Sequence, residues 1–265
     1  MKIPFMKTWL EYFERNRVQR MELPWGGVPD LPAEVLGPLI RSLQRFQVGE
    51  SGEGSHLRRQ AAATGDPCYQ ASIELFVREE QEHARLMANF LQRLGAPLLT
   101  HHWSDACFIF LRHLFSLEHE LLVLLVPEII AKRYFRTLRD RCGEPMLRAM
   151  CAQILHDEEG HVRFHVEFLQ KALARKSFWR RLALLSAWKL LFQAACFVVM
   201  WDHRSILRAL KVSKTAFWLD CSLMFDEAAA AAFRSPAPET ETSDAVAKPD
   251  TDNVATPCMT APQMG

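Results

Sequence analysis

The sequence has no closely paired cysteines, little glycine and no strand-length alternation of polar and apolar residues. Its seven cysteines are odd in number and include no CxxC pair, which argues against a disulfide framework and a cysteine zinc site. Glycine accounts for 11 of 265 residues, and long segments instead repeat apolar residues at helical spacing. The sequence therefore predicts a nearly all-α protein with reduced, mostly buried thiols, as is usual in the cytoplasm.

A strong net charge and a recognisable secretory signal are also lacking. The formal net charge is +1, which gives no reason to expect a nucleic acid as a partner. The N-terminal residues have no continuous apolar stretch before a cleavage site and instead predict an amphipathic helix. Residues 182–201 are long and apolar enough to span a bilayer. Lys189 and Gln193 in their middle favour a buried or membrane-surface helix instead.

Periodicity and composition divide the chain into four parts. Residues 1–32 form an N-terminal extension that ends in a loop rich in proline and glycine, and the composition of residues 233–265 predicts a disordered tail. Between them, helices are predicted at 33–63, 67–95, 103–141, 145–173, 177–200 and 204–231. We expect a helical bundle over residues 33–175, with additional apolar helices packed on it over 176–232. Pro127 is where the long third helix is expected to bend or break.

An internal repeat relates residues 43–92 to residues 121–170, at an offset of 78 residues (121 − 43). It superimposes the triplet Gly65-Asp66-Pro67 on Gly143-Glu144-Pro145. Both triplets suit a turn between helices, since glycine can end a helix and proline readily begins one. Each half is then a helical hairpin, and two hairpins form a four-helix bundle with a pseudo-two-fold axis. The predicted fold class is all-α: a bundle of two duplicated hairpins plus two extra C-terminal helices.

The unusual polar residues of the two halves also coincide. Each half has a Glu-x-x-His motif, whose two ends share a helix face, and a lone glutamate 30 residues before it (80 − 50 and 158 − 128). The lone Glu128 lies in an otherwise apolar run, where an unpaired buried carboxylate would be very costly. Its alternative role is a surface salt bridge to Lys132. The six candidate metal ligands are Glu50, Glu80, His83, Glu128, Glu158 and His161.

This order of motifs resembles that of the ferritin-like di-iron carboxylate superfamily, and the resemblance covers residues 33–175. It implies two iron ions as cofactors, with manganese as an alternative, because carboxylate and imidazole ligands suit both metals. By the resemblance, both metals would be bridged by Glu80 and Glu158. One metal would also bind Glu50 and His83, and the other Glu128 and His161.

Three further residues are candidates for supporting the site. In related bundles, an acid just before the ligand glutamate often forms a hydrogen bond to a ligand histidine across the site. This resemblance would give that role to Glu79 and Asp157. The alternative is that both side chains are simply exposed to solvent. His165 lies one turn after His161 and is a candidate for an extra ligand or a proton relay, with a packed histidine as the alternative.

Three glycines surround Glu50, namely Gly49, Gly52 and Gly54. Because glycine weakens a helix, this cluster needs a reason. It either leaves space for a substrate at the mouth of an apolar pocket or allows helices to pack closely. The three glycines are therefore candidates for lining a substrate pocket.

Within the superfamily, the sequence favours an oxygenase or oxidase. It has no CxxC-bearing rubredoxin domain, and Met87 stands where a ribonucleotide reductase small subunit usually has a tyrosine. The resemblance implies that O2 is used to hydroxylate, N-oxygenate or desaturate a small hydrophobic organic substrate. Electrons would come from an external donor, because no GxGxxG motif is present.

Two other functions stay open. One is a ferroxidase that handles iron without an organic substrate, and the other is a membrane-surface enzyme acting on a lipid or quinone. A homodimer and a peripheral membrane contact through residues 182–201 are likewise open, so the expected location is cytoplasmic, with or without membrane association.

Overall fold

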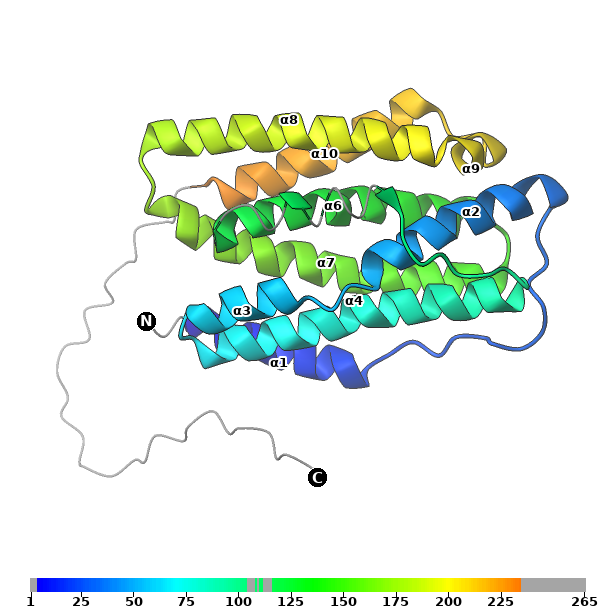
Figure 1. The fold of residues 1–265 in the computed structure, drawn as a ribbon, viewed down its shortest axis with the longest axis horizontal. Helices are drawn as coiled ribbons and strands as arrows, with labels where there is room; N and C mark the ends of the chain where they lie inside the picture. The colour runs from blue at the N-terminus through cyan, green and yellow to red at the C-terminus, as the bar shows by residue number, and fades with distance from the viewer. Residues whose placement is uncertain (1–3, 104–107, 109, 112–115, 235–265) are drawn as a thin grey trace.

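The protein is described by a computed structural model over residues 4–103, 108, 110–111 and 116–234. These residues form helices and connecting loops and include no β-strand. The four long helices of the bundle are α2 (Ala33–Glu50), α4 (Pro67–Arg93), α6 (Leu117–Arg141) and α7 (Pro145–Ala174), as Figure 1 shows. The short helix α3 (Ser55–Ala63) packs against α4 and α6. The predicted all-α bundle of two hairpins is confirmed.

The turns inside both hairpins lie where the repeated triplets predict them. Asp66 accepts hydrogen bonds from the backbone N–H groups of Cys68 and Tyr69, at 2.9 and 3.0 Å, and so caps the start of α4. Glu144 caps α7 in the same way, by accepting a hydrogen bond from the backbone N–H of Leu147. A proline occupies the first turn of each helix. The two hairpins are thus built by the same local chemistry.

The predicted helix 33–63 is interrupted at residues 51–54, which separate α2 from α3. Gly54 has φ +63°, a left-handed conformation that a helix cannot continue through. A Cβ atom at this position would lie 2.6 Å from Cγ2 of Val77, so only glycine fits without a shift. The break allows Glu50 to end α2 at the edge of the site.

Two other predicted helices have different limits, and one predicted break does not occur. The backbone of Ser116, directly before α6, is extended. The predicted helix 103–141 is therefore not continuous at this residue. The predicted helix 204–231 is two helices, α9 (Arg204–Ala209) and α10 (Lys214–Ala232), separated by a turn in which Lys211 has φ 55°. Helix α6 is continuous through Pro127, so of the bend or break expected there, a break does not occur.

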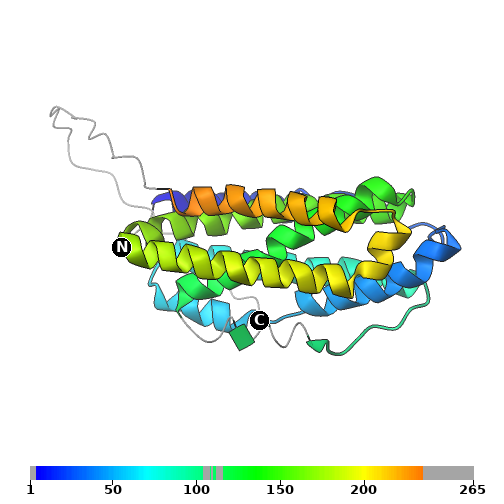
Figure 2. The ribbon, with the colours of Figure 1, turned by 90° about the horizontal axis from the view of Figure 1, so that it is seen from above.

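Two outer layers cover the bundle on opposite sides (Figures 1 and 2). Helix α1 (Pro4–Val18) lies along α4, whereas α8 (Phe178–Asp202) and α10 cover α6 and α7. By length and composition α8 could cross a membrane, and only 22% of its most apolar window is buried. Five cysteines are described as free, four of them buried. The predicted disordered tail lies outside the described residues from residue 235 onward.

Candidate metal centre

The two hairpins bring the six candidate ligands together in the middle of the bundle. Two groups of ligand atoms form, and within each group the atoms lie within 4.8 Å of one another. The first group consists of Glu80, Glu128, Glu158 and His161, and the second of Glu50, Glu80 and His83. Because Glu80 belongs to both groups, the two lie side by side. The cluster is therefore able to hold a pair of metal ions.

The distances link the two groups through Glu80, which belongs to both, and through Glu158. Nδ1 of His161 lies 3.0 Å from Glu80 Oε1, 3.5 Å from Glu128 Oε2 and 3.9 Å from Glu158 Oε2. Nδ1 of His83 lies 3.7 Å from both Glu80 Oε1 and Glu158 Oε1. Glu80 and Glu158 thus each lie close to both histidines.

Five buried polar atoms in this cluster have no hydrogen-bond partner: Glu80 Oε1, His83 Nδ1, Glu128 Oε2, Glu158 Oε2 and His161 Nδ1. Buried polar atoms are normally paired, because each unpaired atom costs roughly 1–3 kcal/mol. All five belong to residue types that ligate iron or manganese through these atoms. The donor set therefore fits a pair of such cations.

Without a cation, protons balance the crowded carboxylates. Burial, followed by the neighbouring Glu128 carboxylate, raises the pKa of Glu158 well above its usual range. Burial and the Glu80 carboxylate raise the pKa of Glu50 in the same direction. Burial alone would lower the pKa of His161, but the nearby Glu128 carboxylate and the hydrogen bond to Glu79 raise it. Metal binding would displace these protons.

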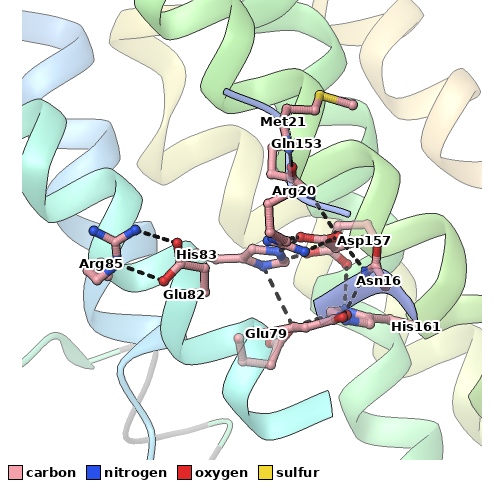
Figure 3. A network of polar contacts seen from close by, with 12 residues as sticks. Asn16, Arg20, Met21, Glu79, Glu82, His83, Arg85, Gln153, Asp157 and His161 are labelled. Atoms are coloured by element: carbon pink, nitrogen blue, oxygen red, sulfur yellow. Dashed lines mark hydrogen bonds and ion pairs between the residues drawn. The ribbon is translucent and has the colours of Figure 1, made fainter. Parts of the chain in front are cut away.

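Each candidate ligand histidine is held by an acid from the other hairpin (Figure 3). Nε2–H of His83 donates to Asp157 Oδ2 at 3.0 Å, and Nε2–H of His161 donates to Glu79 Oε2 at 2.9 Å. These bonds fix the tautomer that leaves each Nδ1 free to bind a metal. The structure thus places Glu79 and Asp157 in crossed contacts across the site.

Helix α1 and the residues after it supply donors that the sequence analysis missed. Nδ2 of Asn16 donates to both Glu79 Oε1 and Asp157 Oδ1, at 2.7 and 2.9 Å (Figure 3). Arg20 binds Asp157 with both terminal nitrogens, at 2.8 and 2.7 Å. Gln153 donates a further bond to Asp157 at 3.0 Å. The pKa of Asp157 is lowered: burial opposes this, but the bonds from His83 and Arg20 outweigh it.

One sequence signal could have pointed to Asn16. It continues the buried face that Met6, Trp9 and Phe13 form at helical spacing, and it is the polar member of that series. A buried polar residue in line with an apolar stripe needs a hydrogen-bonding partner. The partners themselves could not be inferred without the packing of α1 against the bundle.

His165 is buried close to the cluster but does not belong to either group of ligand atoms. Neither of its ring nitrogens has a hydrogen-bond partner. Its ring meets Phe76 edge-on, with centroids 4.7 Å apart. Burial, followed by the charge of His161, lowers the pKa of His165 to about 3, so its imidazole stays neutral.

Two cavities reach the cluster. The first, called here the apolar cavity, has a volume of about 140 Å³ and touches Glu50, Glu80, Glu128 and Glu158. Its apolar wall consists of Phe46, Phe108, Leu124, Pro127, Ala131 and Val199. The second, called here the loop cavity, has a volume of about 290 Å³ and lies under the α2–α3 connection.

The three candidate pocket glycines divide between these cavities. Gly49 lines both, and a Cβ atom added to it would meet nothing within 4 Å. Gly52 and Gly54 line the loop cavity, together with Glu50 and Glu80. The space beside Gly49 is thus open, whereas Gly54 serves close packing against Val77.

No protein-family model matches the sequence, and no curated protein is significantly similar to it. A solved R2-like ligand-binding oxidase, with an aerobically reconstituted metal cofactor after photoconversion, has a TM-score of 0.66 and 14% identity. The match covers 85% of this chain and 92% of that chain. A mutant R2-like ligand-binding oxidase with an aerobically reconstituted Mn/Fe cofactor has a TM-score of 0.64, 12% identity and the same coverage. The chain therefore has the ferritin-like fold of the R2-like ligand-binding oxidases.

Proposed function

We propose that the protein is a di-metal oxidase or oxygenase, with two iron ions or an Fe/Mn pair, that acts on a small hydrophobic organic substrate. In this proposal, both metals bind Glu80 and Glu158. Glu50 and His83 complete one metal site, and Glu128 and His161 complete the other. The unpaired buried ligand atoms and the crossed contacts to both histidines support this assignment. An Fe/Mn pair is considered because one structurally similar oxidase carries such a cofactor.

The observation that carries the proposal is the apolar cavity directly beside four of the candidate ligands. A dry apolar cavity of about 150 Å³ is known to hold a benzene-sized molecule, so the volume suits a single ring or a short aliphatic segment. Such a molecule would lie against Phe46 and Leu124, with its reacting carbon or nitrogen toward the carboxylates. When bound, the metal pair would supply the activation of O2.

The wall of the apolar cavity is held rigidly by packing and hydrogen bonding. The ring of Phe46 stacks on Tyr134 with centroids 4.3 Å apart. The Ser42 hydroxyl lies within hydrogen-bonding distance of Tyr134 Oη and of His203 Nδ1, at 2.5 and 2.6 Å. Burial, followed by the charge of Arg45, lowers the pKa of His203 to about 3, so this wall residue stays neutral. Arg45 also lines this cavity, so a substrate would meet a fixed apolar surface with one guanidinium beside it. The fixed apolar part would orient an apolar substrate and keep water from the reacting atoms.

A ferroxidase activity without an organic substrate is the second candidate, and the loop cavity favours it. Besides Glu50 and Glu80, this cavity is lined by Glu53, His56 and Glu120. A carboxylate-lined route under an exposed loop would suit the entry of Fe(II). An oxidase or oxygenase would need a route for iron only when its metal centre is assembled, whereas a ferroxidase would need one in every reaction cycle.

Metal analysis tests the proposal directly. After anaerobic loading with Fe(II), with and without Mn(II), the wild type is expected to hold two metal ions per chain. Glu128→Ala and His161→Ala should lose at least the ion that these residues bind. Glu159→Ala, one residue from the ligand Glu158, is the matched control, because Glu159 is an exposed neighbour on the same helix. A wild-type protein without bound metal under these conditions would refute the proposal.

Oxygen consumption then separates the two candidates. An oxidase or oxygenase should consume O2 in proportion to added organic substrate and electron donor, with the metal content unchanged. A ferroxidase should consume O2 in proportion to added Fe(II) alone. A hollow multi-subunit shell would also favour iron storage, whereas a monomer or dimer would favour an enzyme.

A further inference from the structure

The outer face of α8 exposes large apolar side chains that no other described helix covers. In Figure 2, α8 and α10 lie side by side on the surface that faces the viewer. Trp179 and Leu190 are each 73% exposed, Phe197 is 63% exposed and Trp201 is 58% exposed. On the opposite face, Trp188, Phe192, Ala195 and Cys196 are buried against the protein. Helix α8 is therefore apolar on both faces, and one of them has no partner among the described residues.

The exposed face forms a single stripe along the whole helix, called here the α8 stripe. At 3.6 residues per turn its members fall within an arc of about 80°. They are Trp179, Ala183, Ser186, Leu190, Ala194, Phe197 and Trp201, all of them exposed. No charged side chain lies in this stripe. Tryptophans occupy both ends, and Ala183 and Phe197 lie at equal distances on either side of the central Leu190.

We propose that the α8 stripe binds the α8 stripe of a second copy of this chain, antiparallel, around a two-fold axis through Leu190. In this register, Leu190 meets itself and Ser186 meets Ala194 of the second copy. Ala183 meets Phe197 of the second copy, so a small residue faces a large one. Trp179 meets Trp201 of the second copy. The stripe is thus complementary to itself, as a two-fold interface requires.

The size of the stripe is sufficient for a specific but weak dimer. From their exposed fractions, its four large side chains present on the order of 500 Å² per copy, taking about 200 Å² for a full aromatic side chain. Two copies would then bury on the order of 1,000 Å², near the lower limit for specific interfaces. We therefore expect the dimer to dissociate on dilution.

Charges near the stripe are compatible with this contact. Lys189 lies beside the proposed axis, and its Nζ is 3.1 Å from Asp226 on α10 of the same chain. The two lysines that approach each other across the axis would therefore each be paired already. A bilayer is the competing occupant of this face. However, the middle of the stripe has alanine and serine, which bury little apolar area in lipid but allow two helices to approach closely.

Paired substitutions distinguish a second copy from a bilayer. Ala183→Phe would place two large rings opposite each other, and Phe197→Ala would leave a gap, so each change should weaken self-association roughly tenfold or more. The double variant Ala183→Phe/Phe197→Ala restores one large and one small residue in each contact and should recover the dimer. Sedimentation velocity over a range of concentrations measures this, against a chain mass of 30.5 kDa.

Cysteine crosslinking tests the register. Under mild oxidation, Leu190→Cys should crosslink two copies, because its sulfurs meet on the axis. Ala183→Cys should not, since two copies of this position would lie about 21 Å apart along the helix at 1.5 Å per residue. The double variant Ala183→Cys/Phe197→Cys should crosslink again. The wild type, treated in the same way, gives the background level of crosslinking through the native cysteines.

Several outcomes would overturn the proposal. One is a wild type that stays at the mass of one chain at every concentration. Another is efficient crosslinking through Ala183→Cys alone, which would mean a parallel contact. A third is binding of the monomer to phosphatidylcholine–phosphatidylglycerol vesicles that increases in Ala183→Phe, which would identify a bilayer as the occupant. Unchanged thermal unfolding of each exposed-site variant shows that folding is intact.

Discussion

Replacing Asn16 by leucine is expected to weaken metal binding, although Asn16 is not itself a candidate ligand. The change keeps the branched shape and the number of side-chain heavy atoms but removes the two hydrogen bonds to Glu79 and Asp157, at 2.7 and 2.9 Å. Hydrogen bonds to charged groups contribute about 1.5–3 kcal/mol each. Asp157 retains Arg20 and Gln153, and Glu79 retains His161, so we expect a loss of about 3 kcal/mol in the free energy of unfolding.

The metal affinity should fall roughly tenfold to a hundredfold, because both acids hold a ligand histidine and residues in this role typically have effects of that size. Anaerobic titration with Fe(II) or Mn(II), read by calorimetry, measures the affinity, and urea unfolding of the metal-free protein measures the stability. Arg17→Ala is the matched control, since Arg17 lies on the same helix but pairs with Glu14 at the surface. A less stable Asn16→Leu protein with wild-type metal affinity would show that the network only supports the fold.

Three other substitutions test separate parts of the structure. Gly160→Ala should release α1 and lower stability by about 1–3 kcal/mol, because its Cβ would overlap the Tyr12 ring. Gly49→Ala has open space and lies in α2, so it should not lower stability in urea unfolding. Arg20→Ala should destabilise the protein most above the ordinary Asp pKa of 3.8, because the lowered pKa of Asp157 stabilises the fold there. This contribution is lost only as the pH falls through the lowered pKa of Asp157. Unfolding measured from pH 6 down to the acid limit of the folded state should show the difference between variants shrink at the acid end, and a difference that does not shrink there would contradict the prediction. Gly49→Leu should fill the apolar cavity, so substrate-dependent O2 uptake should fall while the metal content stays at the wild-type value. A loss of metal would mean instead that Gly49 is needed to position Glu50.

The fold and the cluster of candidate ligands could be predicted from the sequence because their signals repeat. The Gly-acid-Pro triplets and the two Glu-x-x-His motifs recur at one offset, and each is local to a turn or to one helix face. Glu128 also stands out against an apolar run, which marks a buried charge that needs compensation. Repeated motifs of this kind can be recognised in the sequence without knowledge of how the helices pack.

Features that depend on contacts between distant segments could not be predicted in the same way. The break between α2 and α3 depends on the close approach of Gly54 to Val77. Hydrophobic periodicity does not detect this contact and predicts one continuous helix. Pro127 suggested a break in α6, but the packed bundle keeps the helix continuous. The roles of Asn16 and Arg20 depend on how α1 lies across both hairpins, which no pattern within residues 1–32 encodes.

The position of Asn16 also has a consequence for the symmetry of the bundle. Glu79 and Asp157 are equivalent residues of the two hairpins, and a single amide nitrogen donates to both of them. Asn16 must therefore lie close to the axis that exchanges the hairpins. Two identical hairpins, each with its own α1, would need two such side chains at one point. A single donor from one N-terminal helix serves both hairpins, so the two repeated halves depend chemically on an element that lies outside the repeat.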